Sequence, residues 1–275
     1  MGASMARHLL DAGYPLRIHT RTPTRARPLL EAGAEWAATP AELLNDCAVI
    51  LSMVGYPADV ESVYFGEAGL LREAPEGILF IDLTTSSPGL AVRLAEAAGE
   101  AGCESLDAPV SGGDIGASEG RLSIMVGGSQ AAFERARPIL ECFGRTLVHQ
   151  GPCGSGQYCK MANQIAIASG MLGVCEAMAY SRKAGLDPRR VLDSISTGAA
   201  GSWSLQNLAP RMLDGDYAPG FYVKHFLKDL GIALDSAREL GLELPGLELA
   251  RRLYLRLSEA GHAGEGTQAL FRLYE

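Results

Sequence analysis

The order of helical and strand-like segments is the feature that most restricts how this chain can fold. Up to about residue 150, stretches with helical periodicity alternate with short β-rich runs, which is typical of a doubly wound α/β domain. After that point the sequence shows no strand pattern. It therefore predicts two domains, an α/β domain over residues 1–150 and an all-helical domain over residues 151–275.

The α/β part contains segments whose type follows from composition and from the neighbouring turn residues. We expect helices over Ala3–Ala12 and Arg25–Glu31, because a glycine stop follows each of them. A further helix is expected to begin in the segment Thr39-Pro40-Ala41-Glu42, with Thr39 as its N-cap and Glu42 completing a capping box. Short runs of β-forming residues predict strands at 15–20, 48–54, 78–83, 104–108, 122–126 and 146–149.

The second part of the chain opens with the glycine-rich segment Gly151–Gly156, which we interpret as a linker. From Gln157 to Ala184 no proline interrupts a single predicted helix of about 42 Å. This helix is apolar nearly all round, so we expect it to be buried. Polar residues between Asn163 and Glu176 argue against a membrane span.

The composition argues against several classes of protein. The chain has 275 residues and a net charge of −8, which argues against a nucleic-acid partner. Its six cysteines show neither C-x-x-C pairs nor metal-ligand spacing with histidine, so we expect reduced thiols, most of them buried. No secretory signal pattern is visible, and we expect a cytoplasmic protein. Neither a metal site nor a serine-hydrolase elbow is predicted.

A glycine-containing motif follows the predicted strand at 104–108. It runs Leu106-Asp107-Ala108-Pro109-Val110-Ser111-Gly112-Gly113, and Met125-Val126-Gly127-Gly128 follows it. Ser111, Gly112 and Gly113 can present backbone N–H groups without obstruction by side chains, which would form a site for a carboxylate. A plain tight turn would explain Ser-Gly-Gly by itself.

A lysine motif opens the long helix. In Gly156-Gln157-Tyr158-Cys159-Lys160-Met161-Ala162-Asn163-Gln164, two amides follow Lys160 at the third and fourth positions. Because these positions share one face of a helix, Lys160, Asn163 and Gln164 can converge on one point. We interpret Lys160 as a general acid for carbonyl reduction and as the base in the reverse direction. A lysine that extends to solvent from the helix start is the alternative.

These motifs closely resemble those of the β-hydroxyacid dehydrogenases, which include 3-hydroxyisobutyrate dehydrogenases and tartronate semialdehyde reductases. The resemblance covers the chain from Gly2 to Glu275. It implies a Rossmann-type doubly wound sheet followed by an all-helical domain, and hydride transfer between NAD(P) and a short β-hydroxy acid or its semialdehyde. It also implies Lys160 as the catalytic residue, and a homodimer or homotetramer with a small-molecule substrate.

The same resemblance assigns supporting roles to other residues. Val54, Gly55 and Thr85 match residues that contact the cofactor. Pro219-Gly220-Phe221 and Lys228-Asp229-Leu230 match elements in which the lysine reaches the cofactor, while Phe221 and Asp229 lie near the substrate. Taken alone, Thr84 and Thr85 could instead cap the helix that begins at Pro88. The later elements could likewise be a turn and a surface ion pair.

The segment His19-Thr20-Arg21-Thr22-Pro23 bears on the choice of cofactor. An enzyme that uses NAD usually places a carboxylate here for the ribose 2′-hydroxyl, whereas a nearby arginine suits a 2′-phosphate. The segment has no carboxylate, and Arg21 and Thr22 stand in its place. We therefore expect NADP, with NAD as the second possibility. An exposed surface arginine is the alternative interpretation of Arg21.

The chain begins inside the unit that would bind a dinucleotide. Such a fold needs a first strand and a glycine-rich turn before its first helix, but Met1-Gly2-Ala3-Ser4 already runs into that helix. By the resemblance, Gly2 is the third glycine of the turn and contacts the cofactor. We expect the natural protein to start about ten residues upstream. The alternative to an enzyme is a non-catalytic cofactor-binding or assembly module. The missing glycine-rich turn favours this alternative, and the presence of Lys160 argues against it.

Overall fold

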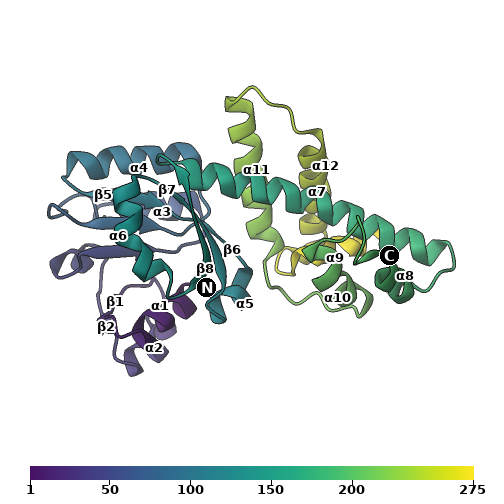
Figure 1. Cartoon of the computed structure of the whole chain (residues 1–275), viewed down its shortest axis with the longest axis horizontal. Helices are drawn as coiled ribbons and strands as arrows, with labels where there is room; N and C mark the ends of the chain where they lie inside the picture. The colour runs from purple at the N-terminus through teal and green to yellow at the C-terminus, as the bar shows by residue number, and fades with distance from the viewer. The chain divides into compact units, whose positions relative to one another are not determined.

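The computed structural model of the protein describes all 275 residues. It divides into two compact units, Met1–Lys160 and Met161–Glu275. The first unit contains every named strand together with helices, and the second contains helices only (Figure 1). The expected class, a Rossmann-type α/β domain followed by an all-helical domain, is confirmed.

The main sheet of the first unit has six strands in the order β3-β4-β5-β7-β6, with β8 paired to β7. The pairs β3–β4, β4–β5 and β7–β8 are parallel, and β7 runs antiparallel to β5 and β6. The parallel strands agree with the apolar runs in the sequence, because strands covered on both faces need apolar residues at successive positions. The strands are β3 (Val49–Ser52), β4 (Leu79–Asp82), β5 (Glu104–Asp107), β6 (Val110–Ser111), β7 (Leu122–Gly127) and β8 (Gly144–Gly151).

A second, two-stranded sheet pairs β1 (Arg17–Ile18) with β2 (Glu35–Trp36) in parallel. No hydrogen-bonded ladder joins it to β3, and no strand precedes α1 (Gly2–Asp11). The strands of the first unit thus form two separate sheets. The strand expected at 15–20 is only two residues long, and β2, its one partner, is equally short.

Two apolar clusters lie on opposite faces of the main sheet. Alternate residues of β4 divide between them: Leu79 and Ile81 pack in one cluster, and Phe80 packs in the other. The first cluster includes residues of α1 and α6 (Gln130–Leu140). The second includes residues of α3 (Pro57–Phe65) and α4 (Pro88–Glu100). Helices on both faces explain why β4 is buried at all four positions.

One short helix of the first unit differs from the expectation based on the sequence. The segment after Thr39 is a 3-10 helix, η2 (Ala41–Asn45), rather than an α-helix. Thr39 Oγ1 accepts from Glu42 N at 3.4 Å, but the Glu42 carboxylate accepts from Ala38 N rather than from Thr39. Because the reciprocal bond is displaced by one residue, the predicted capping box is wrong. The other short helices are η1 (Pro23–Arg25), α2 (Arg27–Glu31) and α5 (Gly113–Ser118).

The second unit is built around the long helix α7 (Ser155–Lys183), which begins in the first unit. Residues of α7 pack with the later helices in one apolar cluster that includes Met171, Phe226 and Tyr254. No helix of the structure combines the length and the apolar character that a membrane crossing requires. The later helices are α8 (Pro188–Ile195), α9 (Trp203–Asn207), α10 (Ala209–Leu213), α11 (Val223–Glu239), α12 (Pro245–Leu257), the π-helix η3 (Ser258–His262) and the 3-10 helix η4 (Thr267–Tyr274).

Two expectations about burial are wrong. Helix α7 is not buried all round, since a stripe from Ala162 to Tyr180 is exposed along one face. Of the six cysteines, only Cys103 and Cys175 are buried, and the other four are half-buried. Cys47, Cys142 and Cys153 lie between elements, where fewer neighbours cover a side chain, and Cys159 lies in the second turn of α7.

Candidate functional site

The segments that follow β3 and β4 are joined by a chain of hydrogen bonds. Val54 N donates to Thr84 Oγ1 at 3.0 Å, and Thr84 N donates to Asp82 Oδ1 at 3.1 Å. Asp82 Oδ1 also accepts from Ser52 Oγ at 2.8 Å. These bonds hold together the two segments that carry Val54, Gly55 and Thr85. In doubly wound folds ligands bind outside these carboxyl ends of the strands.

The alternative role for Thr84 and Thr85, as caps of α4, belongs to a neighbouring residue. Ser87 is the N-cap of α4, and its Oγ accepts from Leu90 N at 3.2 Å. Thr84 uses its hydroxyl for Val54 N instead. Capping therefore does not explain the two threonines.

Gly2 and Arg21 lie beside segments that follow β3. A Cβ added at Gly2 would stand 3.6 Å from Met53 Cβ, so the start of α1 lies beside the residue that follows β3. Arg21 Nη1 pairs with Asp59 Oδ1 at 2.7 Å, although the Arg21 side chain is 77% exposed. Thr22 is the N-cap of η1 and is exposed. Arg21 is therefore accessible to a ligand, but a ligand phosphate would share it with a carboxylate.

The expected glycine loop forms the turn between β6 and α5. Ser111 ends β6, Gly112 stands before α5 with φ of 131°, and Gly113 with φ of 63° is the first residue of α5. A side chain at Gly112 would be strained by this φ, and its Cβ would lie 3.1 Å from Leu122 Cδ2. The two glycines are thus explained by the turn from β6 into α5.

Two residues that were not predicted hold the start of α7. Asp107 Oδ1 accepts from Gly154 N at 2.7 Å, and its Oδ2 accepts from Gln157 N at 2.8 Å. The Gln157 side chain accepts from Ser86 N at 2.9 Å and donates to Thr84 O at 2.8 Å. The signals were present in the sequence, because Asp107 and Gln157 both belong to the quoted motifs. Lys160 follows Gln157 by three residues and is only 6% exposed.

Burial has a marked effect on the Asp107 carboxyl. Desolvation raises its pKa to about 6, and the nearby Asp82 adds to the increase. The N–H groups of Gly154 and Gln157 act in the opposite direction because they stabilise the ionised form. Asp107 is therefore a carboxylate at neutral pH that gains a proton in mildly acidic solution.

In the second unit, four of the predicted residues form one hydrogen-bonded and ion-paired chain. Asn163 Nδ2 donates to Gln164 Oε1 at 2.7 Å, and Gln164 Nε2 donates to Asp229 Oδ2 at 2.6 Å. Lys228 Nζ lies 2.8 Å from Asp229 Oδ1, with the Asp229 side chain only 2% exposed. Asp229 is buried and the Lys228 side chain is only 13% exposed, so the alternative of a surface ion pair is wrong. Phe221 packs edge-on against Phe226, with ring centroids 5.8 Å apart.

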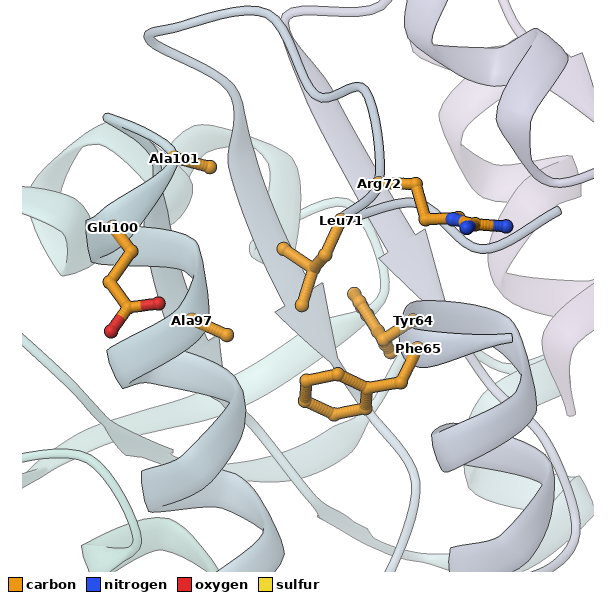
Figure 2. A pocket seen from close by; sticks show the side chains of 7 residues that line it. All are labelled: Tyr64, Phe65, Leu71, Arg72, Ala97, Glu100 and Ala101. Atoms are coloured by element: carbon orange, nitrogen blue, oxygen red, sulfur yellow. The ribbon is translucent and has the colours of Figure 1, made fainter. Parts of the chain in front are cut away.

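A surface pocket of about 360 Å³ lies elsewhere in the first unit (Figure 2). Its lining includes Phe65, Leu71 and Arg72, and Glu100 from the end of α4. None of the predicted site residues lines it. Leu71 and Arg72 precede β4 and Glu100 precedes β5, whereas Val54, Gly55 and Thr85 follow β3 and β4. We therefore do not assign the site to this pocket.

Each of the two parts of the chain matches a known protein family. Residues 1–151 match the family described as the NAD binding domain of 6-phosphogluconate dehydrogenase. Residues 154–274 match the family described as NAD-binding of NADP-dependent 3-hydroxyisobutyrate dehydrogenase. Together these matches span almost the whole chain.

Individual relatives extend over the full length. The oxidoreductase YkwC of Bacillus subtilis is 56% identical over 274 residues, covering 100% of this chain and 95% of the relative. The 2-hydroxy-3-oxopropionate reductase of Escherichia coli is 39% identical over 275 residues, covering 100% and 94%. The structure of 3-hydroxyisobutyrate dehydrogenase from Mycobacterium tuberculosis with L-serine has a TM-score of 0.92, 30% identity and coverage of 99% and 95%. The chain therefore belongs to the NAD(P)-dependent β-hydroxyacid dehydrogenase family.

Proposed function

We propose that the protein transfers hydride between NADP and a short β-hydroxy acid or its semialdehyde, with Lys160 as the general acid and base. The observation that carries this proposal is the buried Lys160 at the start of α7, three residues after a glutamine bonded to the segment after β4. A buried lysine needs a functional or structural partner. The reductase and the serine-bound dehydrogenase among the relatives support this substrate class.

The residues present fit a nicotinamide dinucleotide. Arg21 is exposed, and Gly2 brings the start of α1 beside Met53 without an intervening side chain. Ser86 Oγ is buried and has no hydrogen-bond partner within the chain, so a polar group is available next to Thr85. Gly2, Arg21, Thr22, Val54, Gly55, Thr85 and Lys228 would hold the cofactor, which supplies or accepts the hydride when bound.

The chain's own residues then have defined tasks. Backbone N–H groups at Ser111, Gly112 and Gly113 would bind the substrate carboxylate. Lys160 would donate a proton to the carbonyl oxygen during reduction and accept the hydroxyl proton during oxidation. Asn163, Gln164, Phe221 and Asp229 would complete the binding of the substrate.

The proposal is tested by oxidation of NADPH and NADH in the presence of a panel of short semialdehydes, including 2-hydroxy-3-oxopropionate. We expect turnover with at least one member of the panel. The non-catalytic alternative predicts cofactor binding, measured by quenching of protein fluorescence, with no turnover on any member.

Replacing Arg21 by alanine tests the preference for NADP. We expect KM for NADPH to rise by about 10-fold or more, because a charge-assisted contact to the 2′-phosphate contributes about 1.5–3 kcal/mol. KM for NADH should change less than threefold. An equal change in KM for NADPH and NADH would show that Arg21 forms only the ion pair with Asp59 and does not bind the 2′-phosphate.

We also propose that the exposed stripe of α7 joins two copies of this chain. Its members recur every three or four residues and most are small, which is the spacing of a helix–helix contact. They are Ala162, Ala166, Ser169, Gly173, Glu176 and Tyr180.

Replacing Ala166 by glutamate should turn a dimer or tetramer into a smaller species in light scattering, because a charge would be buried in the contact. The control is Leu240→Glu, which introduces the same charge at an apolar residue that is 63% exposed after α11. Its mass should equal that of the wild type. A monomeric wild type, or an unchanged mass for Ala166→Glu, would contradict the proposal that the α7 stripe joins two copies.

A further inference from the structure

We propose that Asp107 and Gln157 are positioning residues that fasten the first turn of α7 to the ends of β4 and β5 and thereby place Lys160. The inference rests on the proposed function, because it concerns the proton transfer assigned to Lys160. It adds two residues that would touch neither substrate nor cofactor and would act through the lysine.

Asp107 provides the first fastening. The N–H groups in the first turn of a helix have no partner within the helix and need acceptors from elsewhere. Asp107 accepts from two such groups at the start of α7, Gly154 N and Gln157 N, with one carboxylate oxygen for each. It lies at the end of β5, about fifty residues earlier in the chain. The cap therefore fixes the helix to the sheet as well as satisfying its backbone.

Gln157 provides the second fastening. It is fully buried, and both ends of its amide are used: Oε1 accepts from Ser86 N, and Nε2 donates to Thr84 O. These two bonds enclose Thr85, the residue proposed to contact the cofactor. Gln157 and Lys160 are three residues apart and therefore lie on one face of α7. The turn that orients the lysine is thus tied to the segment that would orient the cofactor.

The backbones of β7 and α7 approach so closely that the first turn of α7 cannot shift along the sheet. A Cβ at Gly127, the last residue of β7, would lie 2.7 Å from Gly156 N and 2.4 Å from Asp107 Oδ1. Glycine at this position lets the helix start rest directly against the strand end and the carboxylate. The first turn of α7 consequently has a fixed position against the sheet before any ligand binds.

The charge of Asp107 makes the fastening dependent on pH. The titratable groups that face it are Asp82, its register partner on β4, and Cys153, which precedes α7. With a pKa of about 6, Asp107 is protonated as the pH falls through that value and becomes a weaker, uncharged acceptor for the two N–H groups. We expect kcat to decline below this pH.

The test compares Asp107→Asn and Gln157→Met with the wild type and with Lys160→Met, using NADPH and the best semialdehyde of the panel. Asparagine has one acceptor where the carboxylate has two, and methionine keeps the length of glutamine without its polar atoms. We expect kcat to fall by about 100-fold in each, because misplacement of a reacting group by about 1 Å has effects of that size. KM for substrate should stay within about threefold. The acid limb near pH 6 should be absent in Asp107→Asn.

Ser129→Ala is the matched control. It removes the N-cap of α6, where Ser129 Oγ accepts from Ala132 N at 3.0 Å. The loss of a helix cap costs about 1 kcal/mol of stability, comparable to the loss expected when the cap of α7 is removed. Its kcat and pH profile should equal those of the wild type. If Asp107→Asn does not fold, Gln157→Met carries the same test.

The outcomes separate the two proposals. An active wild type, an inactive Lys160→Met and a folded positioning variant with full kcat would overturn the positioning role and leave the proposed function intact. A fall in kcat that Ser129→Ala shares would also overturn it, because a general loss of stability would then explain the effect. Inactivity of the wild type on the whole panel would overturn the proposed function, and the positioning role with it.

Discussion

Replacing Lys160 by methionine lowers kcat by about 100- to 10,000-fold, the range expected when a positioned general acid is removed. Methionine has a similar length and is suited to a buried position, so the site keeps its packing while the proton is lost. KM for NADPH should change little, because the lysine is assigned to the proton transfer and not to cofactor binding. The measurements are steady-state rates and cofactor binding by fluorescence.

Lys183→Met is the control for this prediction. Lys183 is the last residue of the same helix and is exposed, so the identical replacement there should leave kcat unchanged. A Lys160→Met enzyme with the wild-type rate would show that another group or water supplies the proton. It would also remove the main support for an enzymatic role of the start of α7.

Replacing Gly156 by alanine should lower the free energy of unfolding by about 3 kcal/mol, the cost of overpacking, and abolish most activity. An added Cβ would lie 2.4 Å from Met125 O and 2.5 Å from Asp107 O, closer than atoms can approach. Since these are backbone atoms of β7 and β5, relief requires the helix start to move away from the sheet. Lys160, one turn later, would move with it.

The sign of this change is opposite to helix propensity, which favours alanine over glycine by about 1 kcal/mol. Gly99→Ala in α4 is therefore the matched control, because nothing lies within 4 Å of the added Cβ there. It should leave activity unchanged and stability equal or slightly higher, as measured by urea unfolding. A Gly156→Ala protein with wild-type stability and rate would refute the close seating of α7.

Much of the fold could be predicted because its signals are local. The apolar runs that became β3, β4 and β5 were expected within a few residues of their observed ends. The long helix was expected from Gln157 to Ala184 and is found over Ser155–Lys183. Composition and periodicity act over a few neighbouring residues, so they identify such elements well. Other elements depend on pairing, and the strand expected at 15–20 is reduced to Arg17–Ile18.

Residues of the candidate site could be singled out where they lie in one motif. Lys160, Asn163 and Gln164 were recognised by their spacing, and Asp229 by the Lys-Asp-Leu element. The contact between two of these residues was not visible, because Gln164 bonds Asp229 across 65 positions of sequence. The exposed stripe of α7 was missed for a related reason, because apolar composition shows which residues can be buried and not which ones the later helices cover.

By itself, the sequence determined the order of helices and strands, the two-part organisation and the lysine motif, because each depends on residues that are close together in the chain. Only the tertiary structure decided that Asp107 caps α7, and that Gln157 bonds the backbone around Thr85 across 71 and 73 positions. The physical reason is that a buried hydrogen-bonding group takes whichever partner the packed sheet and helices bring within about 3 Å. A linear pattern carries no record of that distance.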